Sequence, residues 1–502
     1  MLVNSGFQPL CFRRVISTRE PFRRRWVSAF LIGVLSLLPV RSALCQEAAA
    51  TDTKRPPNVL IIVLDALHAP HMSLHGNPKP TTPFLDALAK KSVYFEHAQS
   101  QETSTPPSVA SYFTGVYPTR YLGIENFPSL PRNTPTLATE FRKAGFDTAL
   151  FTDNPFLAEK SGFHRGFDTA RVYDWRLATK EGEYFRGTQA SEKMLKDVKQ
   201  WIGAATEKPW LCYLHVLRPH NPYLVPAPYD TRFQDPPSMT QEQLGIIEKH
   251  VLSWAFLRLR GDRTGTVTCS ESELSQILGL YHGNLNYADS YVERLLSFLK
   301  ASGFSDNTLL IITSDHGESF MEHGELLHAT EPYEELVHVP LILSMPSDSR
   351  FSRKRVRTPV QLVDLAPTLF ELFELPSPPG LSGQSLLPLL EPSAPGAPLR
   401  MLFSQAYKTD TVAVRKGYQK AMVTWPAGAE APSRIEVYDL AQDAAELNNL
   451  ARDAKSLTKD QQELVSAAKT YFRTAQGHKP VSEEPDFSDE QKDQLRALGY
   501  VE

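Results

Sequence analysis

Cysteine is scarce in this sequence, which contains four among 502 residues. Cys11 and Cys45 lie in an unusual N-terminal segment, so Cys212 and Cys269 can form at most one disulfide in the rest of the chain. A small fold held together by several disulfides is therefore excluded. Hydrophobic residues make up 41% of the chain, which is enough for a large core and for a major and a minor domain.

An excess of positive charge is also absent, because the formal net charge is −4 at pH 7. Of the 53 basic and 57 acidic residues, seven basic and one acidic residue lie in residues 1–45, which leaves 46 and 56 in the remainder. That remainder carries a net charge near −10. Nucleic-acid binding depends on clustered Lys and Arg side chains that neutralise phosphates. We therefore expect no nucleic-acid partner.

The first 45 residues have the composition of an export signal. Six arginines and Glu20 precede the apolar run "WVSAFLIGVLSLLPV" at 26–40, and small residues follow it. A bilayer span needs about 20 apolar residues, whereas this run matches the shorter apolar region of a secretory signal peptide. We expect cleavage near Cys45, a mature chain that begins between about 44 and 51, and a periplasmic or secreted protein without a stable transmembrane anchor. The alternatives are an uncleaved anchor, a buried helix and a lipoprotein attached through Cys45.

Continuous apolar runs alternate with helical patterns along most of the chain. The run "NVLIIVLD" at 58–65 is typical of a strand buried on both faces. Strands that alternate with helices predict an α/β fold with a large, mostly parallel sheet covered by helices on both faces. Comparable runs occur at 147–152, 210–216, 307–315 and 339–344, and helical patterns occur at 82–92, 136–145, 191–203, 272–302 and 362–374.

The character of the sequence changes near residue 395. Four short strand patterns and one helical pattern follow, which predicts a small sheet-and-helix subdomain over 395–475. We expect a polar linker at 46–57, the main domain at 58–394 and an acidic tail at 476–502. The short strand patterns lie at 401–407, 411–417, 419–425 and 434–440, and the helical pattern lies at 456–475.

Two of the predicted strands end in acidic residues. Asp65 closes the first strand, and Asp315 with His316 closes the strand at 307–315. An Asp in this position often caps the next helix. Together with the hydroxyl of Thr105, however, these side chains also form a plausible ligand set for one divalent cation. The oxygen ligands favour Ca, Mg or Mn, and the imidazole also suits Zn.

The segment "ETSTPPSVASYFTG" at 102–115 places Thr105 directly before two prolines. Proline is tolerated in the first turn of a helix, so we expect Thr105 just ahead of a helix whose opening turns run from Ser108 to Thr114. The simpler interpretation is that Thr105 caps this helix. The alternative is a nucleophile, which a hydroxyl becomes only with the help of a base or a metal.

Four histidines follow the predicted strand ends. His215 and His220 lie in "HVLRPHNPY", and His323 and His328 lie in "EHGELLHATEPYEE". A single histidine is most often a packing residue, but four in these positions favour a site. Such side chains stabilise charge on a transferred group or protonate a leaving oxygen. We predict catalytic roles for His220 and His328 and substrate contacts for His215 and His323.

From about Asn58 to its end, the sequence resembles the sulfatases of the alkaline phosphatase superfamily. The resemblance rests on several segments in the family's order, including "PNVLIIVLDALHAPHMSLHG", "TPPSVASYFTGVYPTR", "HVLRPHNPY", "DNTLLIITSDHGES" and "VQLVDLAPTLFELFELPSPPGLSGQSLLPLL". It implies an alkaline-phosphatase-like sandwich with a smaller C-terminal subdomain. It also implies metal ligands at Asp65, Asp315 and His316, a nucleophile at Thr105, and substrate-contacting histidines at His220 and His328.

The sequence departs from the sulfatase pattern at four positions. Sulfatases oxidise a Cys or Ser to formylglycine, whereas Thr105 stands here and cannot be converted in that way. Val109 replaces an arginine, Ala66 replaces a second aspartate, and "FTDNPFL" replaces a Lys-x-His segment. We include Asn154 of that segment as a substrate contact. The remaining set looks more like that of lipoteichoic acid synthases and phosphoethanolamine transferases, which use a metal-bound threonine.

The sequence therefore predicts an exported, metal-dependent hydrolase that cleaves a sulfate or phosphate ester through a covalent bond to Thr105. Phosphoryl groups are expected to be preferred over sulfuryl groups. The substrate would be a small molecule or an ester of a glycan or lipid. The alternatives are a phosphotransferase of the phosphoethanolamine-transferase kind, a non-catalytic binding protein on the same scaffold, and a formylglycine sulfatase that acts through another residue.

Overall fold

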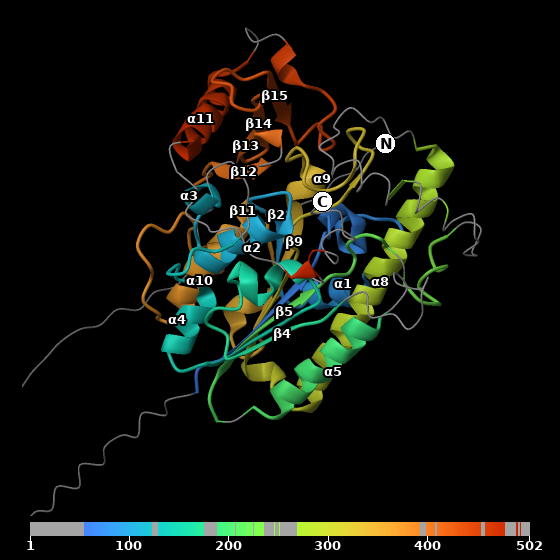
Figure 1. Cartoon of the computed structure of the whole chain (residues 1–502), viewed down its shortest axis with the longest axis vertical. Coiled ribbons are helices and arrows are strands. Elements are labelled where there is room, and N and C mark those ends of the chain that lie inside the picture. Colours follow the sequence, from blue (N-terminus) through green and yellow to red (C-terminus); the bar gives the residue numbers. More distant parts are fainter. Residues whose placement is uncertain are drawn as a thin grey trace, which may run out of the picture. The chain divides into compact units, whose positions relative to one another are not determined.

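The computed structural model consists of two separate units, Met1–Lys54 and Arg55–Glu502, and every described residue belongs to the second unit (Figure 1). The predicted export signal, most of the predicted linker and nearly all of the predicted acidic tail lie outside the described residues, so they stay predictions. The described residues are 55–122, 129–174, 188–205, 207–223, 225–234, 245, 250–251, 269–391, 398–406, 409–452, 457–476, 488–489 and 492.

The main sheet has nine strands in the order β10-β2-β9-β6-β1-β5-β3-β4, and β11 also pairs with β2. Strands β6, β1, β5, β3 and β4 are parallel to one another. The strands are β1 (Asn58–Leu64), β2 (Val93–Gln99), β3 (Asp147–Thr152), β4 (Thr169–Val172), β5 (Trp210–Val216), β6 (Thr308–Thr313), β9 (His338–Ser344), β10 (Lys354–Val356) and β11 (Val360–Gln361).

Five strands of the main sheet differ from the sequence-based expectation, since β2 and the short β4, β10 and β11 were not predicted and β9 has an unexpected direction. Strand β9 was predicted as a strand, but it runs antiparallel to both of its neighbours, β6 and β2. Strand β2 was not predicted. Its burial pattern is interrupted at Glu96 and His97, so it has no continuous apolar run by which to recognise it.

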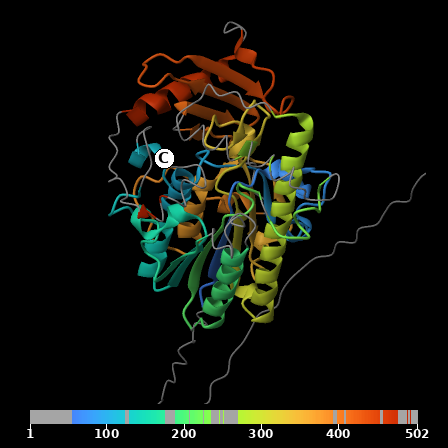
Figure 2. The same ribbon diagram turned by 45° about the vertical axis from the view of Figure 1, so that its right-hand side comes forward.

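Helices cover both faces of this sheet because the side chains of its central strand alternate between two cores. Val59, Ile61 and Val63 of β1 belong to one hydrophobic cluster, and the residues between them belong to the other. Figure 2 shows α5 and α8 together on one face. The first cluster contains side chains of α2 (Thr105–Thr114), α4 (Leu137–Lys143) and α10 (Leu365–Leu372), and the second contains side chains of α1 (Pro83–Ala89), α5 (Gln189–Gly203) and α8 (Glu271–Ala301).

A second, smaller sheet follows the main one in the chain. It is antiparallel with the order β12-β13-β14-β15, and α11 packs against it through Leu464, Ala468 and Phe472. The predicted α/β fold with a large, mostly parallel sheet and a separate small sheet is therefore confirmed. The elements are β12 (Leu402–Ala406), β13 (Thr411–Lys416), β14 (Gln419–Thr424), β15 (Arg434–Asp439) and α11 (Lys459–Gln476); the short elements elsewhere are α3 (Thr119–Leu122), α9 (Glu334–Val337), β7 (Ser319–Phe320) and β8 (Leu326–Leu327).

None of the helices that the structure describes is long and apolar enough to cross a membrane. Cys212 lies buried in β5 and Cys269 lies just before α8, and neither forms a disulfide. The single disulfide that the sequence left open is therefore not formed.

Buried charges join the small sheet to α9 at the edge of the main sheet. The carboxylate of Glu334 accepts hydrogen bonds from Lys420 Nζ and Arg415 Nη1, each at 2.9 Å, and from the Gln99 side chain at 2.9 Å. Lys420 Nζ also lies 2.9 Å from Glu446 Oε1. Burial opposes the charged form of Glu334, but the charges of Lys420 and Arg415 outweigh it and hold its pKa well below its usual range.

We predict that Glu334→Gln lowers the free energy of unfolding by about 3 kcal/mol, because it leaves two buried cations without their shared carboxylate. Urea unfolding of the full chain measures this change. The matched control is Glu463→Gln, which removes a carboxylate that is 55% exposed and lies 3.7 Å from Lys416. The control should cost less than about 1 kcal/mol. Equal effects of the two substitutions would contradict the importance of the buried network.

Candidate active site

Polar side chains gather at the edge of the main sheet where its central parallel strands end. Asp65 follows β1, and Asp315 and His316 follow β6 after one intervening residue. Asn154 follows β3 in the same way, whereas His215 is still within β5. Because β6, β1, β5 and β3 are parallel neighbours, their carboxyl ends meet at one edge, which is where open α/β sheets bind ligands.

Asp65, Asp315 and His316 place one ligand atom each within 4.8 Å of the others, and all three side chains are buried. His316 Nε2 lies 3.6 Å from Asp65 Oδ1 and 3.6 Å from Asp315 Oδ2. Among the described residues, these two carboxylate oxygens have no hydrogen-bond partner. Buried charged oxygens without a partner are costly, and a cation between them would remove that cost. The residues therefore fit the divalent cation that the sequence predicts.

The backbone around His316 fixes the orientation of its ring. His316 Nδ1 lies 2.8 Å from the Gly317 carbonyl oxygen and donates to it, which leaves the lone pair of the neutral ring on Nε2, toward the carboxylates. Gly317 itself packs against the chain before β9. A Cβ atom at this position would lie 2.0 Å from the Glu335 carbonyl oxygen, so a larger residue would displace the metal-binding segment.

Thr105 lies at the N-terminus of α2, and its side chain points into the same cluster. Its Oγ1 lies 3.3 Å from His316 Nε2 and 3.4 Å from Asn154 Nδ2. Thr105 is the first residue of the helix and not the residue ahead of it, because Ser104 occupies the N-cap position. The helix therefore begins three residues earlier than predicted. The interpretation of Thr105 as a helix cap is wrong, since its hydroxyl contacts side chains of the cluster.

The helix holds Thr105 rigidly against the end of β6. All ten residues of α2 are buried. Ser108 Oγ donates to the Asp315 carbonyl oxygen at 2.5 Å, so the first turn of the helix is bonded to the metal-binding segment. Two prolines after Thr105 restrict the backbone of this turn further. The hydroxyl of Thr105 is thus fixed in place before any substrate arrives.

Two residues from neighbouring strands hold the carboxylate of Asp65. Asn154 Nδ2 donates to Asp65 Oδ2 at 2.6 Å, and His215 Nε2 lies 2.9 Å from the same oxygen. His215 Nδ1 in turn lies 2.9 Å from the Tyr213 hydroxyl. The structure thus brings Asn154 and His215 to the predicted site, where they contact Asp65.

Histidines set the electrostatics of the buried Asp65 carboxylate. Burial opposes ionisation of Asp65, but His220, His215 and His316 outweigh it and lower its pKa to about 2. Burial likewise opposes the charged form of His215, but its hydrogen bond to Asp65 and the negative charges nearby raise its pKa. For His220 burial dominates, and its pKa falls below the usual value. Within the described part of the chain, the charge of Asp65 is therefore stabilised by histidines and not by a lysine or arginine.

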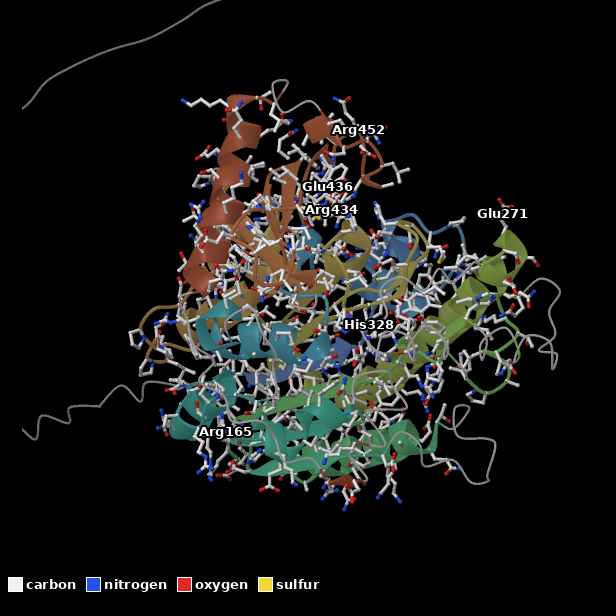
Figure 3. All side chains as sticks on the ribbon, turned by 45° about the horizontal axis from the view of Figure 1, so that its top comes forward. Arg165, Glu271, His328, Arg434, Glu436 and Arg452 are labelled. Carbon is white, nitrogen blue, oxygen red and sulfur yellow. The ribbon has the colours of Figure 1, made fainter. Side chains whose placement is uncertain are left out.

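His328 is labelled in Figure 3. It lies against two other histidines of the site. Its ring centroid is 4.6 Å from that of His316 and 4.6 Å from that of His220. His328 Nδ1 lies 2.7 Å from Glu318 Oε1. His328 is 8% exposed and Thr105 is fully buried, so His328 is the more accessible of the two. A side chain in this position could contact the part of a substrate that lies nearer to solvent.

His323 is not brought together with the other predicted residues. Its ring stacks on Tyr333 with a centroid separation of 3.6 Å. Its Nδ1 lies 2.6 Å from Glu335 Oε1, and its Nε2 lies 3.2 Å from the Glu446 carbonyl oxygen. Both ring nitrogens of His323 therefore have partners near the small sheet. These partners give no support to the predicted contact between His323 and the substrate.

Sequence reasoning missed the residues that support the cluster. Glu318 contacts His328 and lies two residues after His316, within the segment already singled out. Tyr213 could have been inferred, because it stands two residues before His215 in a strand and therefore shares its face. Asn284 of α8 donates to the Pro219 carbonyl oxygen at 3.0 Å and supports the loop that carries His220. Its contribution comes from a helix distant in sequence, and no local pattern signals it.

A separate cavity of about 430 Å³ lies between the first loop of the main sheet and the small sheet. Burial lowers the pKa of His68 well below its usual value and that of His97 to about 4, so these imidazoles are uncharged near neutral pH. Glu96, Glu322 and Glu335 also line the cavity, and its Arg415 is paired with Glu334. The cavity therefore lacks the positive charge that an anionic ester would require.

Comparison with known proteins agrees with this arrangement. The family model "Sulfatase" matches residues 57–375, and the model "N-sulphoglucosamine sulphohydrolase, C-terminal" matches residues 322–470. The chain therefore belongs to the sulfatase family and is an ester-bond hydrolase. It is 26% identical to arylsulfatase K of Danio rerio over 470 residues, which covers 86% of this chain and 87% of the relative.

Solved structures of similar proteins share the fold. The phosphonate monoester hydrolase of Agrobacterium radiobacter matches with a TM-score of 0.65 at 23% identity, over 84% of this chain and 96% of that one. BT4656, solved in complex with its substrate D-glucosamine-2-N,6-O-disulfate, matches with a TM-score of 0.64 at 19% identity, over 86% of this chain and 100% of that one. The predicted family and its alkaline-phosphatase-like fold are thereby confirmed.

We predict that Asp315→Asn loses most of its bound divalent metal and all turnover, yet stays folded. One oxygen of Asp315 accepts only a long hydrogen bond of 3.4 Å from the Ala66 amide, and the other has no partner among the described residues. Metal analysis and thermal unfolding of the purified variant measure both effects. Asp348→Asn is the control, because that carboxylate pairs with Arg350 and should not affect metal content. Full metal occupancy in the Asp315 variant would contradict the ligand assignment.

Proposed function

We propose that this protein hydrolyses phosphate or sulfate esters in a metal-dependent reaction, with Thr105 as the covalent nucleophile and phosphoryl groups preferred. The observation that carries the proposal is the position of Thr105 Oγ1, 3.3 Å from His316 Nε2 and next to two buried carboxylates. Asp65, Asp315, His316 and Thr105 would hold the cation. A bound divalent cation would activate the hydroxyl and offset negative charge on the transferred group.

The residues around Thr105 would orient its hydroxyl for attack on the substrate. Asn154 donates to both Asp65 and Thr105 Oγ1, so it fixes the direction of the hydroxyl. Thr105 must release its proton before attack; the one lone pair of His316, on Nε2, would be engaged by the cation, so a bound cation would favour loss of this proton to solvent. In the attack, Thr105 Oγ1 bonds to the transferred atom while the bond to the leaving oxygen breaks.

His328 is the proposed donor of a proton to that leaving oxygen. Its Nδ1 is engaged by Glu318, which fixes the ring and leaves Nε2 to face other groups. Burial raises the pKa of Glu318 well above its usual value, and the negative charges of Asp65 and Asp315 add to this effect. Glu318 therefore retains a proton more readily than an exposed carboxyl does. A shared proton between Glu318 and His328 supports proton transfer at this edge of the site.

A threonine nucleophile favours phosphoryl over sulfuryl transfer. A formylglycine hydrate has two hydroxyls, so one can expel sulfate after the other has been modified. Thr105 has one hydroxyl, and its ester must wait for direct attack by water at phosphorus or sulfur. In-line displacement by water is the ordinary route at phosphorus. Val109 stands where sulfatases have an arginine. It is fully buried and packs in the hydrophobic core, so no charged side chain acts at this position, which supports the same preference for phosphoryl groups.

The relatives suggest two substrate classes for a test. One structural neighbour is a phosphonate monoester hydrolase, and another was solved in complex with a disulfated glucosamine. We propose a small-molecule or glycan ester as the substrate of this chain. A transferase that passes the phosphoryl group from Thr105 to an acceptor alcohol is the second candidate, favoured by the same single hydroxyl.

We predict that Thr105→Ala abolishes turnover of every ester, since no other hydroxyl occupies its position. Thr105→Ser keeps the hydroxyl and should retain measurable activity. The assay compares aryl phosphate monoesters, phosphate diesters, phosphonate monoesters and sulfates at equal concentration with the full chain and added divalent cation. Phosphorus esters should turn over faster than sulfates. Efficient sulfate hydrolysis that survives Thr105→Ala would show that the nucleophile is a different group.

We predict that His328→Gln lowers kcat by about 10²–10⁴-fold for alkyl esters, whose leaving oxygens need a proton. The loss should be much smaller for aryl esters with acidic leaving groups, which depart without help. Glu318→Gln should show the same dependence on the leaving group with a smaller loss, because Gln can still orient the His328 ring although it cannot share a proton with it. A loss that is equal for alkyl and aryl esters would rule out proton donation by His328 and indicate a role in binding.

A further inference from the structure

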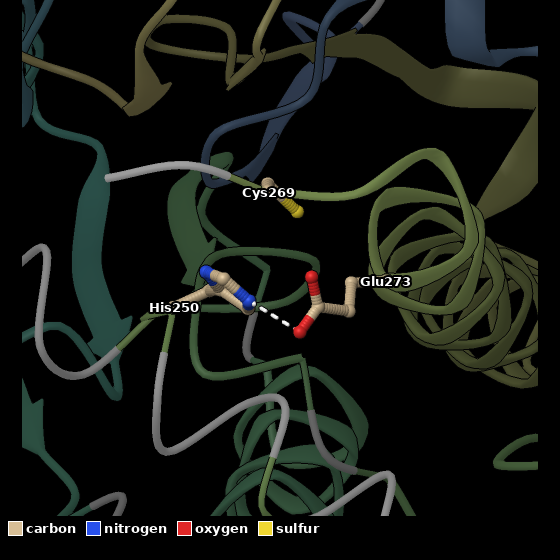
Figure 4. Close-up of side chains that lie close together, drawn as sticks. All are labelled: His250, Cys269 and Glu273. Carbon is tan, nitrogen blue, oxygen red and sulfur yellow. Dashed lines mark ion pairs between the residues drawn. The ribbon is translucent and has the colours of Figure 1, made fainter. Parts of the chain in front are cut away.

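A second cluster of metal-binding side chains lies at the start of α8, away from the residues used in the proposed reaction. His250, Cys269 and Glu273 place one ligand atom each within 4.8 Å of the others (Figure 4). The cluster shares no residue with the Asp65–Asp315–His316 group. It is therefore a separate candidate for ligand binding, to which the ester hydrolysis assigns no role.

The carboxylate of Glu273 is oriented by the cap of α8. Its Oε2 accepts hydrogen bonds from the Ser270 amide at 2.9 Å and from the Ser270 hydroxyl at 2.7 Å. The Ser270 hydroxyl in return accepts from the Glu273 amide, which completes a capping box. One oxygen of Glu273 is thus held by the helix, and the other is presented 3.0 Å from His250 Nε2.

His250 supplies an independent indication of a ligand. Its side chain is fully buried, yet neither ring nitrogen makes a hydrogen bond within the described part of the chain. Figure 4 shows the ring and the Cys269 sulfur directed toward the Glu273 carboxylate. His250 Nε2 meets the Glu273 carboxylate at 3.0 Å without a hydrogen bond, and Nδ1 has no hydrogen-bond partner among the described residues; a metal ion bound to the ring would remove the cost of this incomplete pairing. Glu273 is 20% exposed, so an ion can reach the cluster from solvent.

We propose that His250, Cys269 and Glu273 bind a Zn²⁺-type transition-metal ion, distinct from the cation of the active site. Thiolate, imidazole and carboxylate together suit Zn²⁺, whereas the oxygen-rich set around Asp65 suits harder cations. Three protein ligands leave a fourth position for water. Binding converts the Cys269 thiol to a thiolate and releases its proton to solvent.

The ion would stabilise a helix on which the active site depends. It would join His250 to the first turn of α8, which Glu273 and the Ser270 cap define. Further along α8, the Tyr281 hydroxyl donates to the Ala66 carbonyl oxygen at 2.8 Å. Asn284 of the same helix bonds to the loop that carries His220. Zn²⁺ binding should therefore raise the thermal unfolding midpoint, because it stabilises only the folded chain.

Replacement of the metal by Co²⁺ tests the proposal directly, because a thiolate ligand gives Co²⁺ a charge-transfer absorption in the near ultraviolet. We expect this absorption when the full-length protein is titrated with Co²⁺, and we expect Zn²⁺ to displace it. Cys269→Ser should abolish the absorption and the Zn²⁺-dependent rise in the unfolding midpoint. Cys212→Ser is the matched control and should keep both, because Cys212 is buried in β5.

Two further variants keep the test decisive. Asp315→Asn should keep the thiolate absorption while losing the active-site cation, which separates this proposal from the function proposed above. If Cys269→Ser does not fold, His250→Gln provides the test. It should weaken Co²⁺ binding by more than about 100-fold, which exceeds the effect of losing a residue that only supports a metal ligand. Absence of the absorption in the unaltered protein, or its persistence in Cys269→Ser, would overturn the proposal.

Discussion

The buried carboxylate of Asp65 is the constraint on which the catalytic cluster depends. It stands at the end of the central strand, with β5 and β6 paired on either side, and its side chain is inaccessible to water. A charge in that position requires partners. His215 of β5 and Asn154 after β3 supply hydrogen bonds, and His316 after β6 lies opposite its second oxygen. The parallel arrangement of four strands thus brings these three groups to the charge.

Histidines take over a role that cationic residues fill in the sulfatase pattern. Val109 is buried in the hydrophobic core, so no charge at that position reaches the cluster. Ala66 stands where a second aspartate is usual and has a left-handed backbone with a φ of 58°, held by the hydroxyl of Tyr281. The negative charge around the proposed cation is therefore lower by one carboxylate. The positive charge is also lower, and it depends on the protonation of imidazoles.

The sequence predicted the core of the fold because buried parallel strands have an unmistakable composition. The strands at 147–152 and 210–216 have the predicted bounds, and the strand at 58–65 differs by one residue. Strand β2 was missed because Glu96 and His97 interrupt its apolar run. Residues directly after strand ends, such as Asp65 and Asp315, were identified because the parallel sheet forces such residues together. Partners on distant elements, such as Asn284, follow no local pattern and required the structure.

The prediction of the site was less accurate for the loop that follows β6. His323 and His328 are five residues apart in one loop, and the sequence alone could not separate them. His323 lies in the turn of the short hairpin of β7 and β8, whereas His328 directly follows β8, so the two have different surroundings. His328 contacts Glu318 of the cluster, and His323 contacts Glu335 and the small sheet segment at Glu446.

The small sheet cannot be regarded as an optional appendage. Its β12 edge bonds to the segment before α2, where Ser404 Oγ donates to the Ser100 carbonyl oxygen and the Gln405 amide donates to that of Gln101. Its Lys420 and Arg415 neutralise Glu334. A chain shortened before this sheet would retain every catalytic side chain, but it would lose both the countercharge of Glu334 and the brace beside Thr105. Shuffling of the two parts between relatives is therefore constrained, because each replacement must conserve both contacts at once.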